Sequence, residues 1–151
     1  MMMKDLDVLS YEKVGPCYFN KTSSMEFVDL FGKPLGSRFL KWGSQNLELH
    51  YEGVIARFEK ESGLFCDITF FRDFLPGFSL NGVLFYREDD VLLKLCEMDS
   101  KPMEELGFVC FYSLGVMISD AERDGSFASI NFCNKVPECN GDAKPFAYKV
   151  G

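Results

Sequence analysis

Two stretches of this chain repeat one another at a fixed spacing, LELHYEGVIARFEKESGLFCDITFF at residues 47–71 and VCFYSLGVMISDAERDGSFASINFC at residues 109–133. The alignment has an offset of 62 residues, no gap and six identities in 25 positions. The identical pairs are Gly53 and Gly115, Val54 and Val116, Gly63 and Gly125, Phe65 and Phe127, Ile68 and Ile130, and Phe70 and Phe132. A match at a fixed period indicates an internal structural repeat.

Each copy has the pattern of three antiparallel strands. In the first copy Leu47, Leu49 and Tyr51 alternate with polar residues, which is the two-residue period of a half-buried strand. Gly63 and Gly125 lie in turns, where glycine supplies the positive φ that tight hairpins need. Connections this short require antiparallel pairing. The third strand of each copy is expected at residues 64–71 and 126–133.

A capped helix is predicted before each copy. Ser23 and Glu26 form the Ser-x-x-Glu capping box, whose side chains satisfy free backbone donors at a helix start. In the second half Asp89 or Asp90 caps a helix that stops before Pro102. Short apolar stretches predict one further strand before each helix, at residues 15–19 and 82–86.

These patterns predict an α+β fold of two tandem repeats, each a short strand, a helix and a three-stranded antiparallel meander, packed as one compact unit. The expected segments are residues 1–76 for the first repeat, 77–136 for the second and 137–151 for a C-terminal arm. A chain of 151 residues buries roughly 68–70% of its unfolded surface, so it can fold without disulfide bonds or a structural metal.

The acidic balance limits the classes of partner. With 16 basic against 23 acidic residues the formal net charge is −7, which argues against binding to nucleic acid or to anionic membranes. A basic protein partner fits this charge. No run reaches the ~18 apolar residues of a membrane span, and the first residues lack the apolar core of a signal peptide. We therefore expect a cytoplasmic protein.

No catalytic, metal or cofactor site is predicted. The chain has no phosphate loop, no nucleophile-elbow motif and no dinucleotide fingerprint. Its six cysteines form no Cys-x-x-Cys pair, and the single histidine, His50, completes no usual zinc spacing. The cysteines are interpreted as reduced thiols that pack as small apolar residues, with Cys133 and Cys139 able to pair only under oxidation.

The polar face of the predicted strands is the candidate binding surface. Neighbouring strands place side chains of one face ~4.5–5.5 Å apart, so polar and aromatic residues from both copies should form a continuous surface. Acidic residues at the hairpin turns are interpreted first as solvated turn residues, and contact with a basic partner is the alternative. The candidate partner-binding residues are Glu48, His50, Arg57, Glu59, Glu61, Asp67, Thr69, Phe71, Tyr112, Ser119, Glu122, Asp124, Ser129 and Asn131.

The pattern over residues 14–133 combines a helix exit at Gly32 and Pro34, a Tyr-x-Gly-Val step at Tyr51, Gly53 and Val54, a hairpin glycine at Gly63, and a Phe-x-x-Ile-x-Phe strand at Phe65, Ile68 and Phe70. It resembles the helix-plus-antiparallel-sheet module of the beta-lactamase inhibitory protein family and of SmpA-type outer-membrane lipoproteins. The disulfides, signal peptides and lipidated cysteine of those proteins have no counterpart here. The resemblance therefore implies the fold and a tendency to bind proteins, without a target.

Size, acidity and expected compartment also resemble bacterial immunity proteins of the contact-dependent growth inhibition type. The leading hypothesis is therefore a cytoplasmic immunity protein that binds a cognate toxin with a basic surface, such as a nuclease, and occludes its active site. The alternatives are a small-ligand binding module with a Phe-lined pocket between the repeats, a scaffold subunit, and a hydrolase. The hydrolase would use a carboxylate pair drawn from Asp67, Asp120 and Glu122.

Overall fold

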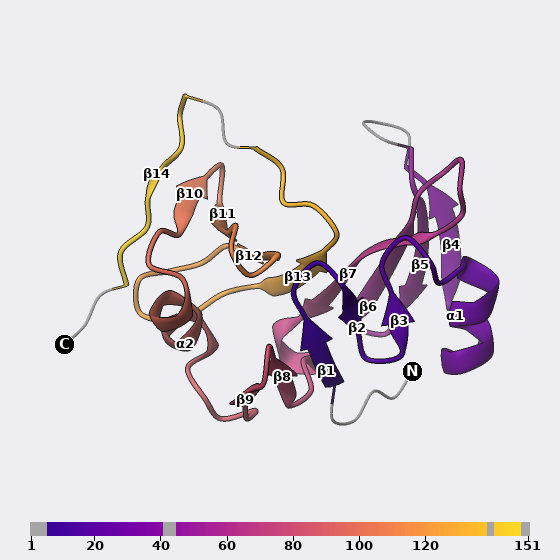
Figure 1. Ribbon diagram of the computed structural model, residues 1–151, viewed down its shortest axis with the longest axis horizontal. Helices are drawn as coiled ribbons and strands as arrows, with labels where there is room; N and C mark the ends of the chain where they lie inside the picture. The colour runs from indigo at the N-terminus through magenta and orange to yellow at the C-terminus, as the bar shows by residue number, and fades with distance from the viewer. Residues whose placement is uncertain (1–5, 41–44, 139–140, 149–151) are drawn as a thin grey trace.

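A computed structural model describes residues 6–40, 45–138 and 141–148 of the chain. Within these residues α-helices occur together with a larger number of strands, so the fold belongs to the expected mixed α+β class, with sheet predominant (Figure 1). The α-helices are Ser24–Phe31 (α1) and Val91–Met98 (α2), and a short 3₁₀ helix at Arg72–Phe74 lies between them in the chain. Residues 41–44 and Cys139 lie outside the described part, and so does any Cys133–Cys139 pairing.

The larger sheet has nine strands in the order β14-β10-β11-β12-β13-β7-β6-β5-β4. Its two halves lie to the left and right in Figure 1 and meet at β13 and β7. Every pairing in it is antiparallel. The strands are Lys144–Pro145 (β14), Met103–Glu105 (β10), Phe108–Phe111 (β11), Val116–Ser119 (β12), Ser129–Cys133 (β13), Phe65–Phe71 (β7), Val54–Phe58 (β6), Leu47–Tyr51 (β5) and Gly36–Phe39 (β4).

The smaller sheet has five strands in the order β3-β2-β1-β8-β9. It joins the beginning of the chain to the segment between the two meanders, because β1 pairs in parallel with β8. The strands predicted at residues 15–19 and 82–86 correspond to β3 and β9 of this sheet. Its strands are Leu6–Leu9 (β1), Lys13–Val14 (β2), Cys17–Tyr18 (β3), Phe78–Leu80 (β8) and Val83–Phe85 (β9).

The strand registers of the two halves correspond at the 62-residue offset. In the first half Val54 pairs with Phe70, and in the second half Val116 pairs with Phe132. At the junction of the halves, β7 and β13 pair antiparallel about Thr69 and its counterpart Asn131. The β7–β13 pairing is therefore symmetric: each strand occupies the same position relative to the other.

The halves differ in their first hairpin. Tyr51 pairs with Val54 across a two-residue turn, whereas Phe111 pairs with Val116 across a four-residue turn. This shifts the first strand of the second copy by two residues, which keeps its apolar side chains on the same face. A second difference is that residues 126–128, expected to begin the third strand, precede β13.

The hydrophobic core lies between one face of the nine-stranded sheet and the elements packed on it. The Phe27 ring of α1 lies 5.5 Å from the Phe58 ring of β6, and the Phe78 ring of β8 lies 5.5 Å from the Phe132 ring of β13. Leu92 of α2 is fully buried in the same cluster. Both helices and the smaller sheet therefore cover this face of the large sheet. On the opposite face Val136 packs on Cys110 and Cys133, and the part of that face around the β7–β13 junction is open.

The predicted caps fix the helix starts. Ser23 Oγ accepts a hydrogen bond from Glu26 N at 3.1 Å, and Glu26 Oε1 accepts one from Ser23 N at 3.1 Å, which completes the predicted capping box. For α2 the cap is Asp90, whose carboxylate accepts from Leu93 N at 3.0 Å. The neighbouring Asp89 accepts from Tyr86 N and pairs with Lys94.

Two turn glycines with the same backbone angle provide a matched test of this fold. Gly53 and Gly63 both have φ +71°, but a Cβ on Gly53 would lie 2.0 Å from Phe74 Cγ, whereas a Cβ on Gly63 would meet open space. Gly63→Ala should reduce the free energy of unfolding by about 1–2 kcal/mol because of the left-handed backbone alone. Gly53→Ala should lose about 1–3 kcal/mol more because Phe74 must move. Urea unfolding of both variants measures the difference, and equal losses would contradict the packing of Phe74 on this turn.

Candidate functional site

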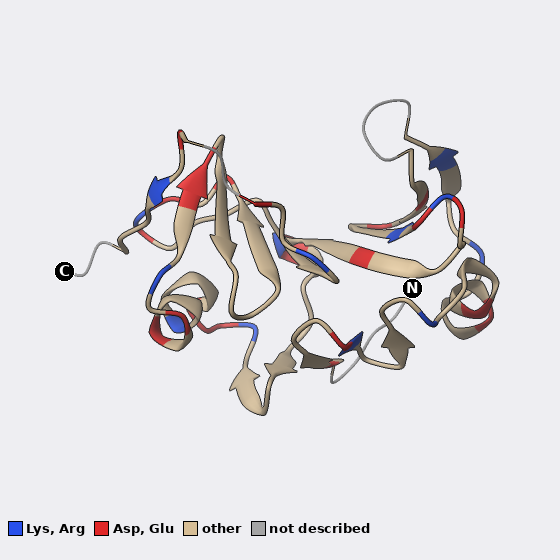
Figure 2. Ribbon diagram, turned by 45° about the horizontal axis from the view of Figure 1, so that its top comes forward, with Lys and Arg blue, Asp and Glu red and all other residues tan. Residues whose placement is uncertain are grey.

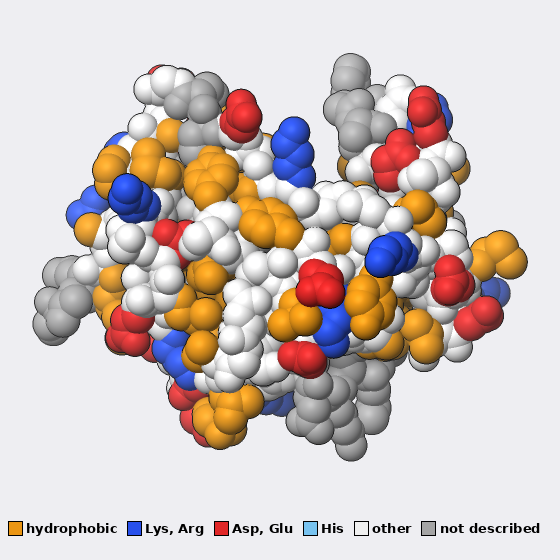
Figure 3. Space-filling model, viewed as in Figure 1, with side chains coloured by type: hydrophobic (Ala, Val, Ile, Leu, Met, Phe, Trp, Pro, Cys, Tyr) orange, Lys and Arg blue, Asp and Glu red, His pale blue; other side chains and the backbone are white. Residues whose placement is uncertain are grey.

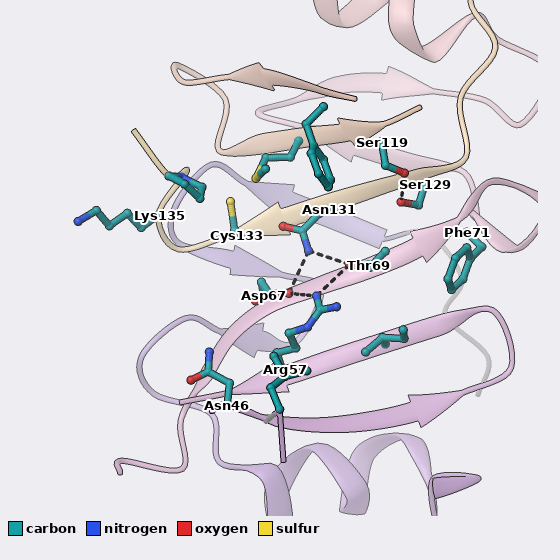
Figure 4. A pocket seen from close by; sticks show the side chains of 15 residues that line it. Asn46, Arg57, Asp67, Thr69, Phe71, Ser119, Ser129, Asn131, Cys133 and Lys135 are labelled. Carbon is teal, nitrogen blue, oxygen red and sulfur yellow. Dashed lines mark hydrogen bonds and ion pairs between the residues drawn. The ribbon is translucent and has the colours of Figure 1, made fainter. Parts of the chain in front are cut away.

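The open face of the nine-stranded sheet carries a groove of about 480 Å³ over the junction of β7 and β13. In Figure 3 the surface is hollowed at the top, between the two halves of the sheet. The groove is lined by seven of the expected partner-binding residues, namely Arg57, Asp67, Thr69, Phe71, Ser119, Ser129 and Asn131 (Figure 4). The strand alternation thus placed these side chains on one face, as predicted.

One cross-strand row of the groove has two serines between two phenylalanines. Phe71 pairs with Ser129, Ser129 with Ser119, and Ser119 with Phe108. The two phenylalanines are 44% and 43% exposed, whereas Ser129 is buried. The two serine hydroxyls are 2.6 Å apart and bond to one another. The row therefore presents two exposed aromatic rings that flank a low polar floor.

The next part of the floor is held by the amide of Asn131. Its Nδ2 donates to Asp67 Oδ1 at 2.9 Å and to Thr69 Oγ1 at 2.8 Å, so it joins β13 to β7 (Figure 4). The Nη1 of Arg57 donates to the same two oxygens, at 2.7 and 3.2 Å. Three strands are thus joined at one point by side chains as well as by backbone pairing.

Glu48 is the centre of a charge network beside the groove. Its carboxylate receives hydrogen bonds from Arg38 Nε at 2.8 Å and Arg57 Nε at 2.7 Å, and its Oε1 lies 2.9 Å from His50 Nε2. The residue is only 1% exposed, which differs from the expected solvated face. The reason is that β4, which the sequence did not predict, adds Arg38 on one side while Arg57 lies on the other.

Burial alone would raise the pKa of the Glu48 carboxyl, but the hydrogen bonds from Arg38, Arg57 and His50 outweigh it and lower the pKa to about 2. Burial of Arg57 opposes its charge, yet Asp67 and Glu48 hold the pKa of the guanidinium above its ordinary value. Both groups therefore stay charged throughout the neutral range. The network fixes the position of Arg57 at the groove.

The other predicted residues lie apart from the groove. The Glu59 carboxylate accepts hydrogen bonds from Glu61 N and Ser62 N, and the Asp124 carboxylate accepts from the N–H and the hydroxyl of Ser126. The Ser62 side chain and these backbone bonds lower the pKa of the Glu59 carboxyl, and the Ser126 hydroxyl and N–H lower the pKa of the Asp124 carboxyl. The turn interpretation therefore accounts for Glu59 and Asp124.

Three predicted residues remain. Glu61 and Glu122 are exposed in the two turns outside the groove. Tyr112 lies in the first hairpin of the second half, and its hydroxyl donates to the Pro137 carbonyl at 2.9 Å. Acidic residues as a whole are spread over both helices, β10 and the turns (Figure 2). The expected surface of clustered acidic and aromatic side chains is thus divided between the groove and the periphery.

Several groove residues were not predicted. Phe108 lies one position before the second copy and pairs with Ser119, so extending the alternation by one residue would have found it. Ile55 is two residues before Arg57 in β6, so its side chain lies on the same face. It is apolar and is therefore not part of the predicted polar surface. Leu40, Asn46, Lys135 and Pro137 come from connecting segments, for which the strand pattern gives no signal.

The cysteines in the described residues are thiols that form no disulfide bond. Burial raises the pKa of the Cys17, Cys66 and Cys133 thiols to about 12. Such thiols carry almost no thiolate at neutral pH and are weak nucleophiles. This agrees with their interpretation as small apolar residues.

Comparison with known proteins gave no match among family models, curated proteins or solved structures. Among the described residues, no group of three or more His, Cys, Asp or Glu side chains is arranged to hold a metal ion. The helices of the described chain are too short, or too polar, to cross a membrane.

The Glu48 network predicts a specific pH dependence of stability. Because the folded pKa is below the ordinary value of 4.5, the contribution of Glu48 is complete above pH 4.5 and is lost as the pH falls toward 2. Glu48→Gln should therefore reduce the free energy of unfolding at pH 7 by on the order of 3 kcal/mol and flatten its fall between pH 5 and 2.5.

Urea unfolding at a series of pH values measures this effect. Glu61→Gln, which changes an exposed carboxylate in a turn, is the matched control and should stay within about 0.5 kcal/mol of the unmodified protein. A Glu48→Gln variant that keeps the original slope would show that the network does not hold Glu48 as an anion.

Proposed function

We propose that this chain is a stoichiometric binding protein, most specifically a cytoplasmic immunity protein that occludes the active site of a basic toxin such as a nuclease. The observation that carries this proposal is the open face of the nine-stranded sheet. Both helices and the smaller sheet pack on the other face of the nine-stranded sheet. The open face therefore presents a surface with two exposed phenylalanines and a polar floor. Aromatic anchors surrounded by polar residues are typical of interface hot spots.

The rigidity of this face supports the same proposal. Side-chain bonds of Arg57, Asp67 and Asn131 tie β6, β7 and β13 together beneath the groove. A surface that is already ordered loses less conformational entropy when a partner binds. The net charge of −7 would in addition attract a basic partner over a distance and speed its association.

We also infer that the two halves are tandem copies of one module, in keeping with the resemblance to the beta-lactamase inhibitory protein family. The support is that sequence identities and strand registers share the 62-residue offset in the second and third strands of each half. The junction pairs one copy with the other about Thr69 and Asn131. A module of this kind offers a protein-binding sheet twice as wide as one copy could form.

Co-expression with the product of the adjacent open reading frame tests the proposed function. The neighbouring product alone should arrest growth, this chain should restore it, and the two should co-elute with 1:1 stoichiometry. The measured association rate constant should fall as the salt concentration rises, since steering by net charge is screened. If the neighbouring product is harmless, or is toxic but neither bound nor neutralised, the proposal is wrong.

Phe71 and Phe108 provide the test of the binding face. The double variant Phe71→Ala, Phe108→Ala should weaken the complex about 30-fold or more, because truncation of hot-spot aromatics costs at least about 2 kcal/mol. The control is Phe74→Ala, which removes a ring of similar exposure (47%) that does not line the groove. Full neutralisation by the double variant would exclude this face as the interface.

A further inference from the structure

We infer that the groove is itself a binding site for a small amphipathic monocarboxylate, with the carboxylate at Arg57 and the apolar body toward Phe71 and Phe108. This goes beyond the proposed function, since it requires no protein partner. Figure 4 shows Arg57 reaching across the floor toward Thr69, with Phe71 at the far end. A volume of about 480 Å³ lies within the roughly 300–1,000 Å³ range of small-molecule sites.

The first argument is the spare donor capacity of Arg57. A guanidinium has five N–H donors. The Nε of Arg57 donates to Glu48, and its Nη1 donates to Asp67 and Thr69. No described residue accepts a hydrogen bond from its Nη2, so two donors of a fixed, charged group remain available in the groove. A carboxylate is the acceptor that such a fork binds best.

The hydroxyls of the floor add further donors. Thr69 Oγ1 accepts from both Arg57 and Asn131, and its own hydrogen has no acceptor among the described residues. Ser119 and Ser129 share one hydrogen bond, which uses only one of their two hydroxyl hydrogens. Thr69 and Ser129 are 9% and 8% exposed, so few water molecules can reach these hydroxyls from above. The floor therefore offers hydroxyl donors to a carboxylate, beside the Asn131 Oδ1 as an acceptor.

The charge balance points to a single negative charge on the ligand. Arg38 and Arg57 are matched by Glu48 and Asp67 within the network. Lys135 also lines the groove and forms no ion pair with any described residue. One positive charge is thus left over in this region of a protein whose net charge is −7. This favours a monoanion over a dianion such as phosphate.

The apolar side chains that line the groove favour a ligand whose remaining part is apolar. Ile55 and Met117 lie on either side of the Thr69–Asn131 pair, and Phe71 and Phe108 flank the serines. A flat or flexible apolar body would cover these side chains and exclude water from the charged contact. A carboxylic acid with one or two rings combines both requirements.

The test uses 1-naphthylacetate as the probe and 1-naphthylacetamide, its neutral isostere, as the matched ligand. Titration is followed by amide chemical shifts and by calorimetry on the isolated protein. The acid should bind 1:1 with a Kd of about 1 mM or tighter, and the amide at least about 10-fold more weakly, because it lacks the charged contact. The largest changes in amide chemical shift should occur in β7 and β13. Inorganic phosphate should compete poorly.

Variants that leave the core intact locate the site. Phe71→Ala should weaken binding of the acid about 5- to 10-fold through the lost ring contact, and Lys135→Ala should weaken it several-fold through the lost charge. Phe74→Ala should leave it unchanged. Arg57→Lys keeps the charge near Glu48 and removes the Nη2 donors, so it should abolish the preference for the acid over the amide.

Three results would overturn the inference: equal affinity for acid and amide, no saturable binding up to about 10 mM, or unchanged binding in Phe71→Ala. If Arg57→Lys does not fold, the Lys135→Ala and Phe71→Ala results decide the matter. Because the partner protein is absent from these experiments, failure here leaves the proposed protein-binding function unaffected.

Discussion

The antiparallel pairing of β7 with β13 is the constraint on which the rest of this structure depends. It joins the two meanders into one sheet, and it does so about the single pair Thr69 and Asn131. On one face it sets Phe70 against Phe132, with ring centroids 6.2 Å apart, in the core. On the other face it aligns Thr69, Asn131 and Ser129 as the floor of the groove. Core and candidate site are therefore formed by alternate residue pairs of the same two strands.

The buried charge of Glu48 makes the register of β5 against β4 and β6 specific. A slip of one residue in β5 would turn the carboxylate into the core and the apolar side chains to solvent, at a cost of several kcal/mol. With the observed register, Arg38 and Arg57 satisfy the carboxylate from the two neighbouring strands. The network then continues through Asp67 to Asn131. One chain of polar contacts thus runs from the edge strand β4 to the junction, and it positions Arg57 in the groove.

Local sequence signals predicted the local structure well. The positive φ of Gly63 and Gly125 and the Ser23 capping box follow from patterns a few residues long. The alternation also placed most of the groove floor on one face. These features depend on backbone sterics and on the two-residue period of strands, which neighbouring residues alone determine.

Features that depend on distant contacts were missed. The parallel pairing of β1 with β8 joins segments about 70 residues apart, and the short strands β4, β10 and β14 gain their structure only from the sheet edges that they extend. The burial of Glu48 follows from β4, so it was missed for the same reason. Lys135 lines the groove from a connecting segment, for which the strand pattern of either half gives no signal.

Native-state hydrogen exchange measured across a urea series tests the central role of the β7–β13 junction most directly. If the junction makes the two halves one cooperative unit, amides of β6 in the first half and β12 in the second should lose protection with the same urea dependence, and those of β7 and β13 should exchange only by the same global opening. Separate transitions for β6 and β12, or early loss of protection at β7 and β13, would contradict this account of the fold.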